Sequence, residues 1–143
     1  MIKTNSNNTP TTETHQNKTQ ECKHTKTNIN QNKPIIFIIG STGVGKTKLS
    51  VELSKKINGE CVSIDSMQIY KHFDIGSAKV TENEQNEVKH HMLDIVECWE
   101  EFSVKDYIER VLPVIDDIHG RGKIPVVVGG TMLYVQSLVY EEA

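Results

Sequence analysis

The fold is decided by residues 35–47, which read Ile35-Ile36-Phe37-Ile38-Ile39-Gly40-Ser41-Thr42-Gly43-Val44-Gly45-Lys46-Thr47. The first five residues form a continuous apolar run rich in β-branched side chains, which predicts a strand buried on both faces. The next eight match the pattern G-x-x-x-x-G-K-[ST], which belongs between a strand and a helix. The stretch therefore predicts a phosphate-binding loop at the carboxyl end of a parallel strand.

The chemistry of this loop follows from its residue types. Its glycines let successive backbone N–H groups face one anion at the positive end of the following helix. Lys46 adds a full positive charge, and the Thr47 hydroxyl can bind a magnesium ion that bridges phosphoryl oxygens. A nucleoside triphosphate and a diphosphate ester would both suit such a loop. The predicted phosphate-binding residues are Gly40, Ser41, Thr42, Gly43, Val44, Gly45, Lys46 and Thr47, and Thr47 is the predicted metal ligand.

Beyond the loop, strand and helix patterns alternate. Apolar runs predict further strands at 61–64, 92–96 and 124–128. A helix over 45–57 would bury Leu49, Leu53 and Ile57, and a capping box at Ser103 and Asp106 opens a helix that ends at Gly120. The stripe of that second helix is Val104, Ile108, Val111, Ile115 and Ile118, and a short last helix carries Leu133, Val135 and Leu138. This order predicts an α/β fold of the P-loop NTPase type, a parallel sheet with helices on both faces.

Length and composition limit the class of protein to which this chain can belong. A chain of 143 residues suits one domain. Residues 1–33 are mostly Asn, Thr, Gln and Lys and predict a solvated low-complexity tail, so we expect the folded domain to span 34–143. The whole chain has a formal charge of −3, but the first 33 residues hold five Lys against two Glu, which leaves −6 for the rest. This charge argues against general nucleic-acid affinity. Three cysteines without a C-x-x-C pair favour a reducing compartment, and no apolar run is long enough for a membrane helix.

A second loop follows the strand at 61–64. Asp65 comes at the carboxyl edge of the sheet, where parallel sheets bind ligands, and should face the phosphate loop. Its carboxylate could bind magnesium through water, accept a proton from a nucleophile, or cap a following helix. Ser66 and Gln68 offer donors and acceptors suited to a base edge. Met67, Ile69 and Tyr70 are interpreted as packing residues.

Six further residues are candidates, and most of them also have a purely structural explanation. Lys79 would contact a phosphate or lie in solvent. His90 and His91 lack companions at metal spacing, so they are interpreted as structural or substrate-edge residues. Trp99 and Phe102 could stack on a base but are typical of packing beside a helix start. Thr131 follows Gly129-Gly130 and is a candidate ligand residue.

Taken together, these segments resemble the tRNA isopentenyltransferases, also called tRNA dimethylallyltransferases. The resemblance rests on GSTGVGKT at 40–47, DSMQIY at 65–70, DIGSAK at 74–79, HHMLDI at 90–95 and GGTMLY at 129–134, in family order. It covers almost all of residues 35–140. Family enzymes continue well beyond GGTMLY, so the chain resembles their N-terminal P-loop portion and looks truncated.

The resemblance implies transfer of a dimethylallyl group from dimethylallyl diphosphate to the exocyclic N6 of the adenine next to the anticodon in tRNA, with Mg²⁺ as cofactor. Asp65 matches the family carboxylate that takes the proton of the attacking amine. The implied catalytic residues are Asp65, Thr47, Lys46 and Thr131, and the implied tRNA- or adenine-binding residues are Asp65, Ser66, Met67, Gln68 and Thr131. A cytoplasmic enzyme is expected, with a mitochondrial one as the alternative.

Three other functions remain open from the sequence. The related adenylate isopentenyltransferases prenylate AMP, ADP or ATP, and a short chain suits such a small acceptor. A small-molecule kinase would use the loop for ATP, although no Arg-rich lid segment is present. An inactive nucleotide-binding fragment would keep the loop without turnover.

Overall fold

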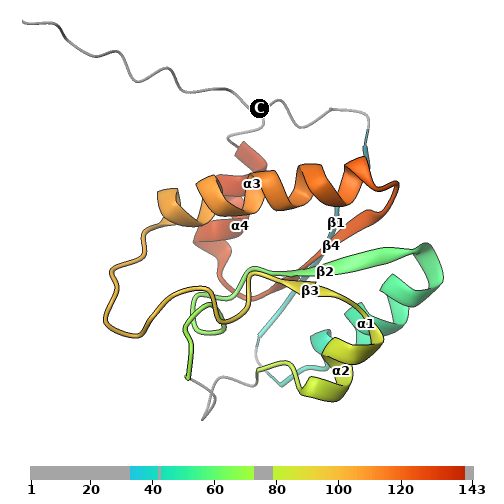
Figure 1. Cartoon of the computed structure of the whole chain (residues 1–143), viewed down its shortest axis with the longest axis horizontal. Helices are drawn as coiled ribbons and strands as arrows, with labels where there is room; N and C mark the ends of the chain where they lie inside the picture. The colour runs from blue at the N-terminus through green and yellow to red at the C-terminus, as the bar shows by residue number, and fades with distance from the viewer. Residues whose placement is uncertain (1–32, 42, 73–78, 141–143) are drawn as a thin grey trace, which may run out of the picture.

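The computed structural model describes residues 33–41, 43–72 and 79–140, over which strands and helices alternate. The elements are β1 (Ile36–Ile39), α1 (Lys46–Ile57), β2 (Gly59–Ser63), α2 (Glu82–Glu87), β3 (His90–His91), α3 (Val104–Gly120), β4 (Ile124–Gly129) and α4 (Met132–Tyr140) (Figure 1). The predicted elements at 45–57, 61–64, 103–120, 124–128 and after Thr131 are confirmed within a few residues.

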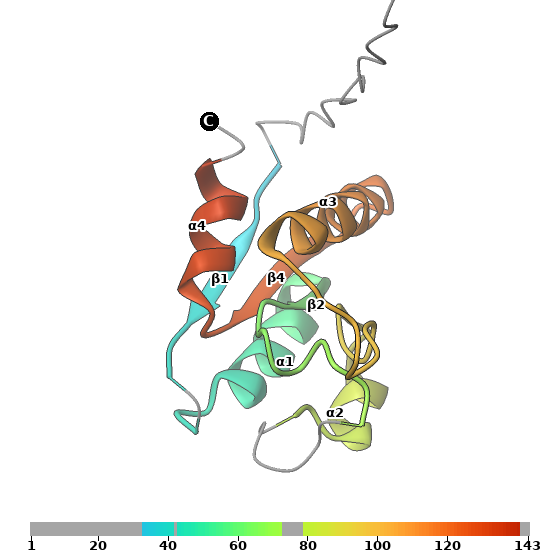
Figure 2. The ribbon, with the colours of Figure 1, turned by 90° about the vertical axis from the view of Figure 1, so that its left-hand side faces the viewer.

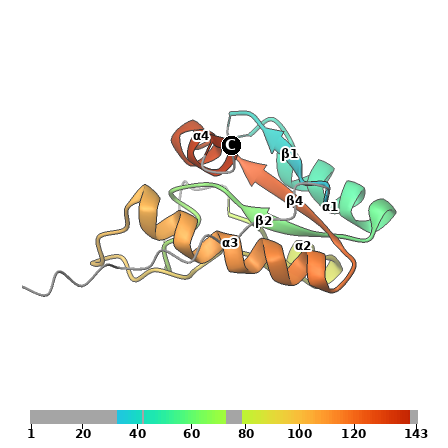
Figure 3. The same cartoon turned by 90° about the horizontal axis from the view of Figure 1, so that it is seen from above.

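The strands form one parallel sheet in the order β1-β4-β2-β3. In this register Val126 lies between Ile36 and Cys61, and His90 lies opposite Cys61 on the other side. Figure 1 shows α3 and α4 on one face of the sheet and α1 and α2 on the other, and Figure 3 shows β1, β4 and β2 side by side. The predicted α/β class with helices on both faces is confirmed.

The main core lies between the sheet and the α3–α4 layer (Figure 2). The predicted stripe of α3 is confirmed: Ile108 through Ile118 are buried at every expected position, and Val104 is partly buried against them. Tyr107 is also fully buried, and its ring stacks on that of Tyr134 from α4 at 4.5 Å between centroids. Packing in this core holds β2, the strand that leads to Asp65, in position.

The α1 interface differs from the prediction. Leu49 is 53% exposed, and the buried residues are Ser50, Val51 and Ser54. Ser54 Oγ lies 3.4 Å from the Cys61 sulfur on β2. The predicted stripe is wrong at Leu49, whereas Leu53 and Ile57 are partly buried. Small side chains let the start of the helix lie close to the sheet, and the larger Leu49 side chain is left outside.

The third strand also differs. It forms at His90–His91, whereas the predicted 92–96 segment is bent by positive φ angles of 63° at Met92 and 52° at Asp94. An isolated bridge between Tyr70 and Val96 continues the parallel pairing there. The sequence analysis also missed α2, which has no buried residue and is set by the capping box of Thr81 and Glu84.

Two further expectations concern the N-terminal tail and the absence of a membrane helix. Of the predicted 1–33 tail, all but Lys33 lies outside the described residues, so the tail and the domain boundary stay predictions. None of the helices described in the structure is long and apolar enough to cross a membrane.

Candidate functional site

The loop after β1 has the backbone geometry that anion binding requires. Gly43 and Gly45 take φ angles of 83° and 89°, in the left-handed region that favours glycine. Gly45 also precedes the first turn of α1, which has no side-chain cap and no acidic residue. The first N–H groups of α1 are therefore not used by a capping side chain and add their partial positive charge to the loop. Thr42, one of the predicted phosphate-binding residues, lies outside the described residues.

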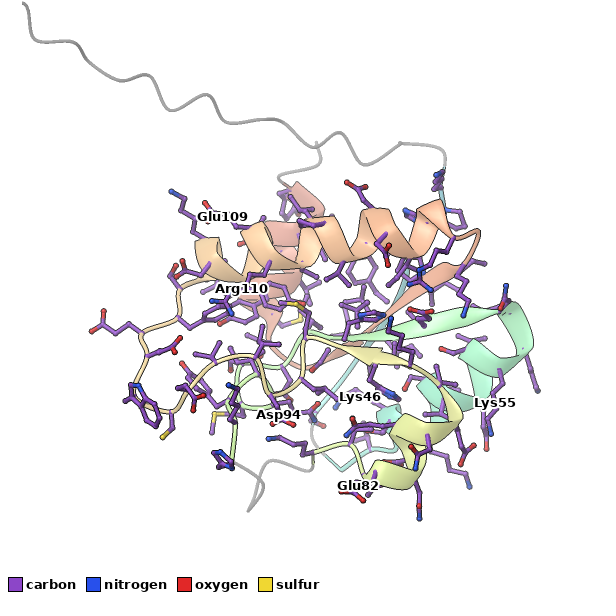
Figure 4. The ribbon with its side chains drawn as sticks, in the orientation of Figure 1. Lys46, Lys55, Glu82, Asp94, Glu109 and Arg110 are labelled. Atoms are coloured by element: carbon purple, nitrogen blue, oxygen red, sulfur yellow. The ribbon has the colours of Figure 1, made fainter. Side chains whose placement is uncertain are left out.

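Lys46 and Thr47 are the half-buried side chains of this loop. The Lys46 ammonium donates a hydrogen bond to the Ser41 carbonyl at 2.5 Å, so the lysine folds back over the loop. Figure 4 shows Lys46 on the α1–α2 side of the sheet. Val44 is 64% exposed and its side chain is apolar, so its backbone N–H, rather than its side chain, is suited to bind an anion. The loop thus keeps a full positive charge at the helix start.

A cavity of about 310 Å³ joins the phosphate loop to the second loop. Its lining includes Lys46 and Thr47 from the first loop, Asp65 and Gln68 from the second, and His90 from β3. The structure therefore brings the predicted phosphate-binding lysine, metal ligand and carboxylate to one space. The predicted site residues that do not line it in the described structure are Gly40, Ser41, Val44, Ser66, Met67 and Thr131.

Asp65 begins a turn rather than a helix. Its Oδ1 accepts a hydrogen bond from the backbone N–H of Met67 at 2.8 Å, the pattern of an Asx turn. The alternative of a helix cap at Asp65 is wrong, since residues 66–72 form turns and an isolated bridge, and no helix. Among the described residues no hydrogen bond reaches Oδ2 of Asp65, which leaves that oxygen for a ligand.

The other residues of the second loop divide between packing and the cavity. The Gln68 Oε1 accepts a hydrogen bond from the Ser63 hydroxyl at 3.2 Å, which orients its amide beside the cavity. Ile69 is fully buried, as its packing interpretation requires. Met67 is 44% exposed, so the packing interpretation does not hold for it.

Thr131 contacts this loop directly. Its Oγ1 accepts a hydrogen bond from the Ser66 backbone N–H at 2.9 Å and lies 3.3 Å from the Ser66 hydroxyl. The structure thus gives Thr131 a positioning role, and its contact with a substrate stays a prediction.

The glycine pair before Thr131 allows close packing of backbones. A Cβ added at Gly129 would lie 2.6 Å from the Ile64 carbonyl oxygen, and one added at Gly130 would lie 2.9 Å from the Gly40 carbonyl oxygen. The Gly40 N–H donates to the Gly129 carbonyl at 3.3 Å. The ends of β1, β2 and β4 therefore meet at this pair, which the sequence analysis interpreted as a tight turn beside an anion.

Lys79 is not a solvated side chain, and its contact with a phosphate stays a prediction. Its ammonium forms an ion pair with Asp94 at 2.5 Å and donates to the Tyr70 carbonyl at 2.9 Å. Its side chain is only 8% exposed. Lys79 therefore ties the second loop to the segment after β3. Residues 74–78 of the same motif lie outside the described residues.

The two histidines of β3 face opposite sides of the sheet. His91 Nε2 lies 2.6 Å from Glu60, a buried carboxylate that also binds Arg121 and Lys123. His90 lines the cavity, and burial lowers the pKa of its ring. In the described part of the chain no group of three or more His, Cys, Asp or Glu residues could hold a metal ion.

The aromatic candidates differ in exposure. Trp99 is 76% exposed. Phe102 is partly buried at the start of α3, and the Arg110 guanidinium lies 5.1 Å from the centre of its ring. Figure 4 shows Arg110 pointing from α3 toward this segment, while Glu109 points away. The packing interpretation is confirmed for Phe102 only.

Comparison with known proteins gives the family. Residues 68–143 match the model of the family described as IPP transferase. The chain is 56% identical over 106 residues to the tRNA dimethylallyltransferase of Caldanaerobacter subterraneus, covering 74% of this chain and 34% of that protein. It is also 56% identical over 108 residues to the enzyme of that name from Bacillus licheniformis, covering 76% and 34%.

Solved structures agree. The tRNA isopentenylpyrophosphate transferase of Bacillus halodurans superposes with a TM-score of 0.74 at 48% identity, covering 76% of this chain and 36% of that one. A eukaryotic dimethylallyltransferase acting on tRNA gives 0.71 at 44% identity, covering 74% and 26%. The chain spans about a third of the length of the curated relatives that it matches. The chain belongs to the IPP transferase family, whose matched curated members are named tRNA dimethylallyltransferase.

Proposed function

We propose that this chain takes part in transfer of a dimethylallyl group from dimethylallyl diphosphate to N6 of the adenine next to the anticodon in tRNA. The observation that carries the proposal is the single cavity lined by Lys46, Thr47 and Asp65. It places an anion-binding helix start beside a carboxylate, the two groups that such a transfer needs. The names of the relatives support the same reaction class.

The phosphate loop binds the leaving group in this proposal. When the bond between the allylic carbon and oxygen breaks, the diphosphate departs with the electron pair and its negative charge grows. Backbone N–H groups at the start of α1 and the Lys46 ammonium stabilise that charge as it develops. Lys46 must leave the Ser41 carbonyl to do so, a movement that its long side chain permits.

Asp65 acts on the nucleophile. Its Oδ1 is held by the Met67 N–H, so the orientation of the carboxylate is set before substrate arrives. Oδ2 then accepts a hydrogen bond from the adenine amine and takes its proton as the new bond between N6 and carbon forms. Gln68, oriented by Ser63, lies along the same cavity and offers an amide to the base edge.

The residues present fit a magnesium ion. Thr47 and Asp65 line the same cavity and supply only oxygen donors, which Mg²⁺ prefers, and a substrate diphosphate would complete its ligands. Thr47 would hold the ion, whose charge would offset that of the phosphoryl oxygens. Every other contribution described here comes from the protein itself.

Affinity for the whole tRNA depends on the charge of the chain. Residues 34–143 carry a net charge of −6, and phosphate contacts by Lys and Arg dominate affinity for nucleic acids. We therefore expect this chain to bind tRNA weakly and to lose that binding as salt rises. The adenine contact at Asp65 supplies position rather than affinity.

The test offers magnesium, dimethylallyl diphosphate and either tRNA or AMP to the purified chain and weighs the products by mass spectrometry. A mass gain of one dimethylallyl group on tRNA supports the proposal. Modified AMP alone would move the assignment to adenylate prenylation, and phosphoryl transfer from ATP would move it to a kinase.

Binding measurements test the loop without turnover. In calorimetric titrations with inorganic pyrophosphate and magnesium, Lys46→Met should lower the affinity for pyrophosphate about tenfold or more, because a charge-assisted contact is removed. Lys56→Met, at the exposed far end of α1, should bind as the unaltered chain does. Asp65→Asn should keep pyrophosphate affinity and lose turnover. Equal pyrophosphate binding by the Lys46 and Lys56 variants would refute the loop assignment.

A further inference from the structure

His90 shares the cavity with the phosphate loop but comes from another part of the sheet. It lies on β3 opposite Cys61 of β2, and both residues line the cavity together with Lys46. Its position is set by a paired strand rather than by a loop. A side chain on a rigid strand that reaches a ligand cavity is well placed to select what binds there.

The hydrogen bonding of the ring fixes its tautomer. The Nδ1 of His90 lies 2.7 Å from the Val88 carbonyl oxygen. A carbonyl only accepts hydrogen bonds, so Nδ1 carries the proton and donates it. In the neutral ring the other nitrogen, Nε2, is then an acceptor. Burial lowers the pKa of His90 and so favours this neutral form.

That acceptor has no protein partner. The Nε2 of His90 is buried, and no described residue donates a hydrogen bond to it. A buried acceptor without a donor is unfavourable, so a bound group that supplies an N–H or O–H would gain from meeting it. The neighbouring His91 differs, because its Nε2 contacts Glu60 at 2.6 Å in a complete ion cluster.

We propose that Nε2 of His90 accepts a hydrogen bond from an N–H or O–H of the adenine nucleotide that enters this cavity, which makes His90 a specificity-determining residue for the acceptor substrate. This inference rests on the proposed function, because it distinguishes the two substrates named there. The prenyl chain of dimethylallyl diphosphate offers no donor, and its ionised phosphates are acceptors. The adenine nucleotide offers both an amine and ribose hydroxyls.

Two substitutions separate a ligand role from a structural one. His90→Asn places an amide near Nδ1 and can keep the bond to Val88, but it removes the acceptor at Nε2. His90→Gln places its amide oxygen near Nε2 and gives up the Nδ1 bond. A purely structural histidine would tolerate Asn better than Gln, whereas a ligand-contacting Nε2 predicts the reverse order.

The experiment titrates AMP and, separately, inorganic pyrophosphate into the magnesium-containing protein by calorimetry. We expect His90→Asn to weaken AMP binding about tenfold, the effect of one lost hydrogen bond, and His90→Gln to stay within about threefold. Both variants should bind pyrophosphate as the unaltered chain does. His91→Asn is the matched control and should lower thermal stability while leaving AMP affinity unchanged.

The outcomes are distinct from those that test the proposed function. Tight AMP binding by His90→Asn or equal losses in both variants would each overturn the role of His90. Failure to bind pyrophosphate would instead overturn the proposed function.

A spectroscopic measurement covers the case in which a variant does not fold. In the unaltered protein, nitrogen NMR of His90 should show a pyridine-type Nε2 signal that shifts when AMP is added and stays in place with pyrophosphate. An Nε2 signal unchanged at saturating AMP would contradict the proposal without any substitution.

Discussion

The hydroxyl oxygen of Thr131 accepts a hydrogen bond from the backbone N–H of Ser66 at 2.9 Å, although the two residues lie 65 positions apart in the chain. The contact joins the start of α4 to the loop that carries Asp65. It is reinforced by a backbone hydrogen bond from the Thr131 N–H to the Ile64 carbonyl at 3.4 Å. The position of the proposed base therefore depends on a residue in another loop.

Replacing Thr131 with valine should release this loop. The variant keeps the shape of the side chain but leaves the Ser66 N–H without its acceptor, so we expect a loss of about 1 kcal/mol in the free energy of unfolding. Urea denaturation measures it. Thr131→Ser keeps the oxygen and should restore most of the loss, and a Thr131→Val variant as stable as the original would contradict the positioning role.

Tyr107 holds the strand end that precedes Asp65 from the opposite face. Its buried hydroxyl donates to the Ser63 carbonyl at 2.8 Å, and burial raises the pKa of the phenol well above its usual range. Tyr107→Phe keeps the stacking on Tyr134 but leaves the buried carbonyl unpaired. We expect a loss of about 1–2 kcal/mol in unfolding free energy.

The stacking contact itself provides the control for Tyr107. Tyr107→Leu removes both the ring and the hydroxyl and should cost more than Tyr107→Phe, because the contact with Tyr134 at 4.5 Å is lost as well. Thermal unfolding of the two variants side by side separates the contributions. Equal stability of the phenylalanine variant and the original would show that the Ser63 hydrogen bond is of no consequence.

The glycine pair predicts a steric effect. Gly129→Ala would place a methyl group 2.6 Å from the Ile64 carbonyl, so backbone must move, and we expect a loss of about 2–3 kcal/mol. Gly120→Ala is the matched control, since nothing lies within 4 Å of its added Cβ. That change should be neutral or stabilise the helix end by about 0.5 kcal/mol. Denaturant midpoints of the two variants provide the comparison, and similar values would exclude the close approach.

Glu60 predicts a pH dependence of stability. Its side chain is 2% exposed, forms ion pairs with Arg121 and Lys123 and contacts His91, and the Arg121 hydrogen bonds hold the pKa of Glu60 far below its usual range. Because the folded pKa is lowered, the contribution to stability is complete above the unfolded pKa of about 4.3 and is lost as pH falls below it. Unfolding measured from pH 7 down to pH 3 should show this decline.

Substitution isolates the Glu60 contribution. Glu60→Gln should be less stable at pH 7 by about 1–2 kcal/mol, since it loses the ion pairs while Arg121 and Lys123, each about a third exposed, remain partly hydrated, and its difference from the original should shrink toward pH 3. Glu109→Gln serves as control, because Glu109 is exposed and pairs only weakly with Lys105 at 3.7 Å. A constant difference at all pH values would rule out the lowered pKa.

Local patterns predicted most of the fold. The apolar run at 35–39, the glycine-lysine loop and the capping box at Ser103 each depend on residues near one another in sequence, and the structure confirms that these elements form. The predicted burial of β1 on both faces was wrong, because β1 is an edge strand of the sheet and Ile39 is 42% exposed. β3 could not be predicted in the same way. Two residues suffice for it because they pair with Cys61 and Val62, a long-range contact that leaves no periodicity of its own.

The sequence predicts which loops form the site, but not which of their residues contact one another. Topology alone places the loops after β1, β2 and β4 at one edge of the sheet, which is why Lys46, Thr47 and Asp65 could be named. The hydrogen bond between Thr131 and Ser66 and the entry of His90 into the cavity depend on packing between distant segments. The prediction of the buried face of α1 was wrong for the same reason. Ser50 and Ser54 are buried because they lie close to β2, and not because they are hydrophobic.

The contact of Gly129 and Gly130 with the ends of β1 and β2 has a practical consequence for chimeric enzymes. The spacing between the three loops is encoded in main-chain atoms that touch, so no change of rotamer can widen it. A transplant of the phosphate loop from a distant relative must bring a compatible residue pair at the end of β4 with it. Recombination with a junction between residues 47 and 129 should therefore preserve the fold only when the parent that supplies residues 129 and 130 carries glycine at both positions.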